Sequence, residues 1–158
     1  MDRTQLLARL ETAWRDFLES FAGLSDSEML KPGVTGGWSV RDILAHVTTW
    51  EQEALKHLPT VLKGAKPPRY SVTHGGINGF NRMMTEQKRD LTLTDVRRQL
   101  HETHRQLIDF LGSVTDEQFR TETAFRHRLR LDTYSHYPKH TEALRRWRQQ
   151  QLAGKDAS

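Results

Sequence analysis

The sequence predicts an all-α, single-domain protein, built as an up-and-down four-helix bundle with one long crossover loop. Apolar residues recur at three- and four-residue spacing along most of the chain, as amphipathic helices require. Only 35 % of the 158 residues are apolar, which suits helices that bury one face and disfavours an extensive parallel sheet. This length suffices for one buried core. We expect the bundle to occupy residues 1–152 and the tail, 153–158, to be disordered.

Two long helices are predicted before residue 60. The first, residues 4–21, places six apolar side chains on one face. The second begins after Ser39, a good N-cap residue, and Asp42 three positions later completes a capping box. Pro59 is expected to limit its end, because proline lacks the amide hydrogen that a helix interior needs.

The second half contains the crossover and two further bundle helices. Residues 62–76 are rich in Gly, Pro and Lys, and this loop is too long for a hairpin between adjacent helices. Helices are expected over 77–91, from a cap at Thr94 to about Gly112, and over 133–152. Residues 115–119 indicate a capped turn, and the partial alternation in 125–131 indicates a short extended stretch.

Composition excludes several classes of protein. Without cysteine there is neither a disulfide nor a thiolate metal site, so any metal must bind His, Asp or Glu. No apolar run approaches the length of a membrane span, and the amphipathic N-terminus lacks a signal-peptide core, so we expect a cytoplasmic protein. The net charge of +4 gathers late in the chain. No nucleic-acid-binding motif accompanies it, so a solvated helix face is expected and nucleic-acid binding is not.

Four of the eight histidines have an informative context. His136 and His140 are four residues apart, a spacing that stacks two metal ligands on one helix face, although such pairs also arise by chance. His46 points toward the apolar stripe of its helix, where an imidazole needs a metal or a hydrogen bond to a nearby carbonyl. His104 has a similar position and is expected to be hydrogen-bonded and structural.

Two segments resemble one known family. Residues 37–47 (GWSVRDILAHV) are similar to the start of the second helix in DinB-like proteins, and residues 133–140 (TYSHYPKH) to their late His-x-x-x-His motif. The resemblance implies a single Ni, Zn or similar ion bound by the residues that match, His46, His136 and His140. Residues 48–51 and 78–81 resemble the ClbS/DfsB-like branch more closely. The family also implies a homodimer.

Three neutral imidazoles leave open positions on a divalent ion, which can then activate water or a thiol, or polarise a carbonyl. Such donors favour Ni, Cu and Zn over Mg and Ca. The resemblance implies a hydrolase, or a transferase that uses a low-molecular-weight thiol, acting on a small electrophile in stress or detoxification. The ClbS-like branch adds hydrolytic protection against a DNA-alkylating metabolite. The alternative is a metal-free small-molecule-binding or genotoxin-protection protein with structural histidines.

Further side chains are candidates for the same site. Glu51 is a candidate base or ligand-orienting group, and an ordinary exposed glutamate is the alternative. Tyr137, also taken as a catalytic candidate, is expected to line the pocket with Asn81 and Trp50, although core packing is the simpler interpretation of Trp50.

Pro138 lies between the two late histidines and is incompatible with an undisturbed helix there. Either the last helix begins close to His136, which puts Pro138 in its first turn, or the helix is kinked at this proline.

Overall fold

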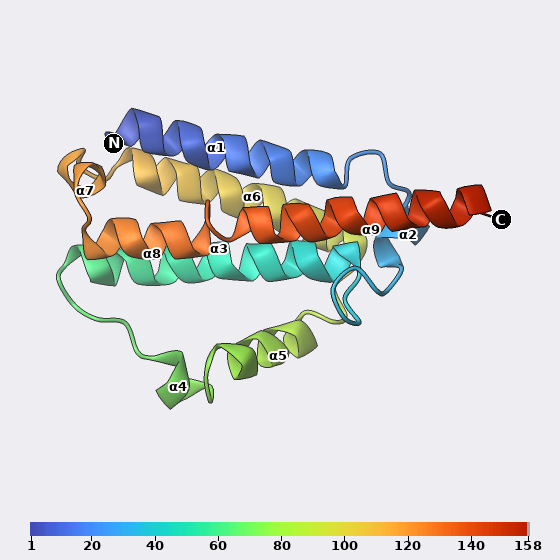
Figure 1. Ribbon diagram of the computed structural model, residues 1–158. Helices are drawn as coiled ribbons and strands as arrows, with labels where there is room; N and C mark the ends of the chain where they lie inside the picture. The colour runs from blue at the N-terminus through green and yellow to red at the C-terminus, as the bar shows by residue number, and fades with distance from the viewer. Residues whose placement is uncertain (158) are drawn as a thin grey trace.

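The computed structural model describes the backbone of residues 1–157 and side chains through 154. The chain forms a four-helix bundle (Figure 1). Three of its helices are α1 (Arg3–Ser20), α3 (Val40–Leu62) and α6 (Leu93–Gly112), and the fourth position in the bundle is occupied by two successive helices, α8 (Ala124–Asp132) and α9 (Tyr137–Ala157). Shorter helices connect them: α2 (Asp26–Leu30), α4 (Tyr70–Thr73), α5 (Ile77–Gln87) and α7 (Glu117–Arg120). Within residues 1–157 no strand forms beyond one isolated bridge, so the predicted all-α class is confirmed.

The core lies where α3 packs against α6 and α8, with α1 and α9 closing the other side. The first turns are fixed by reciprocal caps, since the predicted capping box of Ser39 and Asp42 is present and Asp2 and Gln5 form another on α1. The largest fully buried side chains come from all four bundle positions and from α2 and α7: Tyr137, Phe17, Phe119, Phe125, Leu6, Leu10, Met29, Ile43, Leu44, Leu58, Leu100 and Leu107.

Pro59 does not end α3, contrary to the sequence prediction. The helix continues to Leu62, and the proline lies in its last turn. Val61 and Leu62, which follow the proline, are partly buried against the core, so the apolar face of α3 keeps packing past the proline. Burial of this face outweighs the one backbone hydrogen bond that Pro59 cannot donate.

The predicted extended stretch 125–131 is wrong, because these residues form α8. Thr123 caps the helix through a hydrogen bond from the amide of Arg126. Phe125 and Leu129, four residues apart, are buried, whereas Leu131 is 52 % exposed. The burial therefore has helical period, and the alternation in the sequence was incidental.

The last bundle position is broken between α8 and α9. Helix α9 begins at Tyr137 rather than at 133, so Pro138 is its second residue, where a missing amide hydrogen costs nothing. Of the two expected arrangements, the structure has the late helix start. Helix α9 continues to Ala157, past the predicted end at Leu152, while Ser158 lies outside the described residues. The cap of α6 is Thr92, two residues before the predicted Thr94.

The crossover occupies residues 63–92 and contains α4 and α5. Helix α4 lies within the stretch 62–76 that the sequence predicts to be a loop, whereas α5 lies within the predicted helix 77–91. It returns the chain along the bundle, so that α3 and α6 run in the same direction (Figure 1). Helix α5 packs on α3 through Phe80, its one buried side chain. Over the described part of the chain, no helix is long and apolar enough to cross a membrane.

Candidate metal centre

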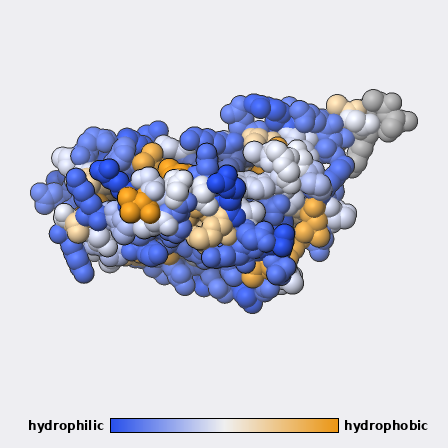
Figure 2. Space-filling model, turned by 90° about the horizontal axis from the view of Figure 1, so that it is seen from below, coloured by the Kyte–Doolittle hydropathy of each residue, from blue (hydrophilic) through white to orange (hydrophobic). Residues whose placement is uncertain are grey.

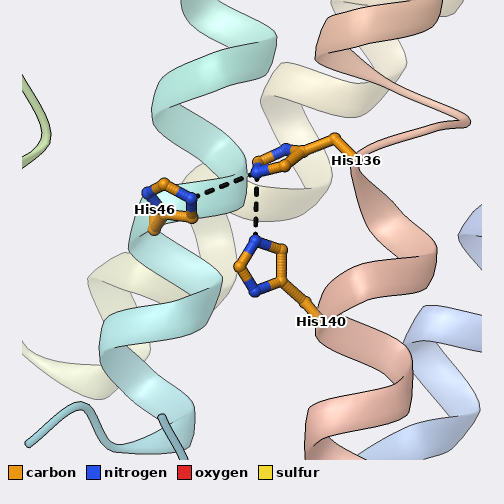
Figure 3. Close-up of side chains that lie close together, drawn as sticks. All are labelled: His46, His136 and His140. Carbon is orange, nitrogen blue, oxygen red and sulfur yellow. Dashed lines mark hydrogen bonds between the residues drawn. The ribbon is translucent and has the colours of Figure 1, made fainter. Parts of the chain in front are cut away.

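Three imidazoles converge where α3 faces the break between α8 and α9 (Figure 3). The Nε2 atom of His136 lies 3.1 Å from that of His46 and 3.0 Å from that of His140. One nitrogen from each ring can be chosen so that all three lie within 4.8 Å of one another. The predicted convergence of these residues is therefore present.

Local structure places each ring. His46 lies two turns into α3, whose start is held by the Ser39 capping box. His136 precedes α9, and its amide donates a 2.8 Å hydrogen bond to the carbonyl of Thr133. His140 stands in the first turn of α9. The late pair therefore meets across a helix start, and not within one continuous helix as the spacing alone suggested.

All three imidazoles are neutral at pH 7. Burial lowers the pKa of His46 to about 3, with smaller contributions from the charges of His140 and Lys88. Burial, followed by the charge of His140, lowers the pKa of His136 to about 2. Burial and the neighbouring Lys139 lower the pKa of His140 to about 4. Neutral imidazole is the form that binds a metal ion.

The hydrogen-bonding capacity of the three rings is not filled within the protein. A neutral imidazole nitrogen carries either one hydrogen or one lone pair, so Nε2 of His136 can make a full hydrogen bond with only one neighbour. Its Nδ1 atom is buried without a partner among the described residues. A cation between the Nε2 atoms would use three lone pairs at once, although it would leave this Nδ1 atom unchanged.

Aromatic and polar residues surround the rings. The indole of Trp38 lies 4.8 Å from the ring of His46, and that of Trp50 lies 6.4 Å from His136, between ring centroids. Trp50 is buried and donates a 3.0 Å hydrogen bond from Nε1 to Oδ1 of Asn81 on α5. Core packing therefore explains Trp50, as the simpler interpretation held, and Asn81 lines the cavity beside His46 as expected.

An open groove leads toward this cavity. It has a volume of about 580 Å³ and is lined by Trp38 and by one face of α5, with Asn78, Asn81, Arg82, Thr85 and Glu86. Asn81 and Thr85 also line the inner cavity that His46 borders. A small molecule in the groove would therefore lie next to the three rings.

Glu51 is fully buried, so its interpretation as an ordinary exposed glutamate is wrong. Its carboxylate contacts Nδ1 of His104 at 3.1 Å, while Nε2 of His104 contacts Glu11 at 2.7 Å. Trp14 stacks on the His104 ring, with centroids 3.8 Å apart. Both ring nitrogens of His104 thus have hydrogen-bond partners, and its role is structural, as predicted. Within the described residues, no hydrogen bond or ion pair joins Glu51 to the three histidines, so its catalytic role stays a prediction.

The side chain of Tyr137 points into the same inner cluster. It is fully buried, and its ring packs against Trp14 and Phe17. Burial and then the nearby charge of Glu51 raise the pKa of its hydroxyl, which lacks a partner of ordinary hydrogen-bond geometry. Its catalytic role also stays a prediction. Glu11 could not be identified from the sequence, since nothing in the pattern of the first helix indicates a partner for His104.

The comparisons with known proteins agree with this architecture. The family model of the DinB superfamily matches residues 9–150. The chain belongs to the DinB superfamily. No curated protein matches this DinB-superfamily sequence.

Several solved structures share the fold, among them the following three. The first is a Sibling Lethal Factor Precursor, DfsB, with a TM-score of 0.78 and 17 % sequence identity, and the match covers 96 % of this chain and 97 % of that one. The second is an uncharacterised protein from Escherichia coli, with a TM-score of 0.77 and 16 % identity over 96 % of this chain and 95 % of that one. The third is the colibactin self-resistance protein ClbS in complex with double-stranded DNA, with a TM-score of 0.76 and 14 % identity over 92 % of this chain and 94 % of that one. The expected ClbS/DfsB-like neighbours are thus present, and at these identities the likeness concerns the fold.

Proposed function

We propose that this DinB-superfamily protein binds one divalent metal ion through His46, His136 and His140 and acts on a small electrophile, by hydrolysis or by transfer of a low-molecular-weight thiol. The observation that carries the proposal is the set of three neutral Nε2 atoms, two pairs of which lie 3.1 and 3.0 Å apart. Their lone pairs are not all used within the protein, and neutral nitrogen donors suit Zn or Ni.

The spacing fits an ion. With metal–nitrogen bonds of about 2.1 Å, adjacent ligands at roughly 90–109° put their nitrogens about 3.0–3.4 Å apart. The two short Nε2 separations lie at the start of this interval. These two pairs therefore need little movement to become ligands, and the nitrogens of His46 and His140 lie within 4.8 Å of each other.

The chain's own residues supply the rest of the site. A divalent ion held there supplies Lewis acidity, which polarises a carbonyl or lowers the pKa of water or a thiol. Trp38 forms one wall of the groove beside His46, and the polar face of α5 forms the other. The hydrogen bond from Trp50 holds Asn81 at the junction of groove and cavity, which orients the substrate against the rings.

Calorimetry on protein prepared without a His-tag and stripped with a chelator tests the metal site. We expect the wild type to take up one Zn²⁺ or Ni²⁺ ion per chain and His46→Ala to take up none. His101→Ala is the matched control, because His101 is exposed and outside the site. Circular dichroism would show that each variant folds. A wild type that binds no ion, or a His46→Ala variant that binds as well as the wild type, contradicts the proposal.

A second candidate function is metal-free binding of a small molecule, or protection against a genotoxin, with structural histidines. The contact between Nε2 of His136 and a neighbouring ring favours it, because one full hydrogen bond there links two of the three rings without an ion. It also accords with the fold shared with ClbS, the colibactin self-resistance protein. Metal-free protein of unchanged thermal stability, whose reaction with electrophiles resists chelators, would support this candidate against the first.

A cytoplasmic homodimer completes the proposal. The family resemblance is what supports the dimer. The face in Figure 2 is mostly hydrophilic, with separate small apolar patches, so we do not expect this face to form the interface. Light scattering at high concentration that gave the mass of a monomer would contradict the dimer. We expect no nucleic-acid binding, although ClbS was solved with double-stranded DNA, and a gel-shift titration with duplex DNA tests this expectation.

A further inference from the structure

The inner cavity beside His46 carries a second feature. Helix α3 supplies one wall, with Arg41, His46 and Thr49, and α5 and its C-cap supply the other, with Asn81 and Lys88. Its accessible volume is about 10 Å³, close to the space of one water molecule. A cavity of this size, with polar side chains in both walls beside Ala45 and Met84, has room for one polar atom, and not for a ring or an alkyl chain.

Two cations border this cavity, and their hydrogen bonding differs. Arg41 donates to the carbonyls of Lys88, Arg89 and Leu91 and pairs with Asp42 at 2.9 Å, so its guanidinium serves to hold the end of α5. The ammonium of Lys88 donates only to the neutral Oε1 of Gln52, at 2.9 Å.

The ammonium of Lys88 therefore has hydrogen-bond donors without a partner among the described residues. An ammonium carries three hydrogens, of which one is used. Within the described residues no carboxylate lies within ion-pair distance of it, and the opposite charge that helps to keep it protonated is that of Glu53. Burial lowers the pKa of Lys88 to about 8 against this opposing effect of Glu53, so most of it remains charged at pH 7.

Asn81 supplies another donor at the same place. Its Oδ1 atom accepts the indole hydrogen of Trp50, which fixes the orientation of the amide. The Nδ2 group then has no hydrogen-bond partner among the described residues, while Asn81 lines both the cavity and the outer groove. The ammonium and this amide are thus unfilled donors bordering one small space.

We propose that Lys88 and Asn81 form an anion subsite beside the three histidines, and that the substrate carries a carboxylate. One positive charge and a few donors match a monoanion, whereas a phosphate dianion would need more of both. One carboxylate oxygen, similar in size to a water molecule, would occupy the inner cavity, while the rest of the substrate lies in the groove, next to the imidazoles. The identity of this ligand as a substrate rests on the proposed function, but the subsite itself does not require a metal ion.

The test uses metal-free protein and sodium acetate at constant ionic strength, followed by nuclear magnetic resonance. The readout is the indole N–H signal of Trp50, because this group is hydrogen-bonded to Asn81. We expect a saturable shift in the wild type and about tenfold weaker binding in Lys88→Met, the effect of losing one charge-assisted hydrogen bond. Lys66→Met is the matched control, since Lys66 is exposed in the crossover.

A second variant, Asn81→Asp, keeps the subsite testable if Lys88→Met does not fold. Asn81→Asp keeps an oxygen for the indole of Trp50 but replaces the amide donor with negative charge, so it should also abolish the acetate response. A wild-type shift that does not saturate, or an equal response in Lys88→Met and Lys66→Met, overturns the subsite. Metal calorimetry on the same samples separates the two proposals, because acetate binding without metal uptake refutes only the proposed function, and metal uptake without acetate binding refutes only the subsite.

Discussion

Lowering the pH from 7 to 5 should destabilise the folded chain through its three buried imidazoles. Each of them is neutral in the fold, because burial and neighbouring positive charge lower its pKa. In the unfolded chain each regains an ordinary pKa near 6.5 and takes up a proton over this interval. A group whose pKa is lowered by folding contributes stability above its unfolded pKa, and this contribution is lost as the pH falls.

The magnitude follows from His136, whose pKa drops from 6.5 to about 2 on folding. Between pH 7 and pH 5 the unfolded state gains about 2 kcal/mol from proton uptake at one such histidine, whereas the folded state gains almost nothing. Three histidines acting alike would remove roughly 6 kcal/mol, which is comparable to the whole stability of many domains. Groups with a raised pKa, such as Asp132, offset part of this loss.

Replacing one ring isolates its contribution, because the other titrating groups are common to both proteins. Urea unfolding of chelator-treated wild type and His136→Leu at pH 5, 6 and 7 gives the free energy of unfolding of each. We expect the wild type to lose about 2 kcal/mol more than the variant between pH 7 and pH 5. If both lose the same amount, His136 is not held neutral by the fold, and the argument for three metal-ready imidazoles fails.

Three further changes should have measurable effects. Burial raises the pKa of Asp132 to about 6, so its contribution to stability is complete below about pH 3 and falls by about 3 kcal/mol on going to pH 7. Asp132→Asn should lack this fall in urea unfolding. Burial lowers the pKa of His104, but the hydrogen bond that its ring donates to Glu51 helps to raise it above the ordinary value, so Glu51→Gln should cost about 2 kcal/mol at pH 6 and less as the pH rises through the pKa of His104. Asn81→Ala removes the hydrogen bond of the Trp50 indole and should cost about 1 kcal/mol, with faster amide exchange in α5; unchanged exchange would show that this bond does not hold the helix.

The bundle helices could be predicted because their apolar spacing and caps are local. The Ser39 capping box and the convergence of His46 with the late pair both follow from such signals together with the family resemblance. The start of α9 could not be chosen from the sequence, since Pro138 is compatible with a late start or a kink. Tertiary packing decides where a chain leaves one helix and enters the next, and it does so beyond the range of a local pattern.

The interior polar cluster shows another limit. The sequence favours an exposed position for Glu51, because a glutamate in a helix is usually solvated. Its burial depends on His104 and Glu11, which belong to two other helices and lie far away in the sequence. Similarly, Lys88 carries no local signal that separates it from other lysines. Its significance comes from the cavity and from the nearby arginine that already has its partners.

At the break between α8 and α9, the number of residues in the chain decides whether His136 and His140 can meet, as much as the identity of those residues does. Each residue added to a helix rotates everything beyond it by about 100°. An insertion within residues 138–139 would therefore swing His140 away from His136 and shift the phase of α9 against the core. An insertion at Ser135, which is exposed in the turn before the helix, would be absorbed more easily. Variants of this protein should accordingly tolerate length changes on one side of His136 and reject them on the other.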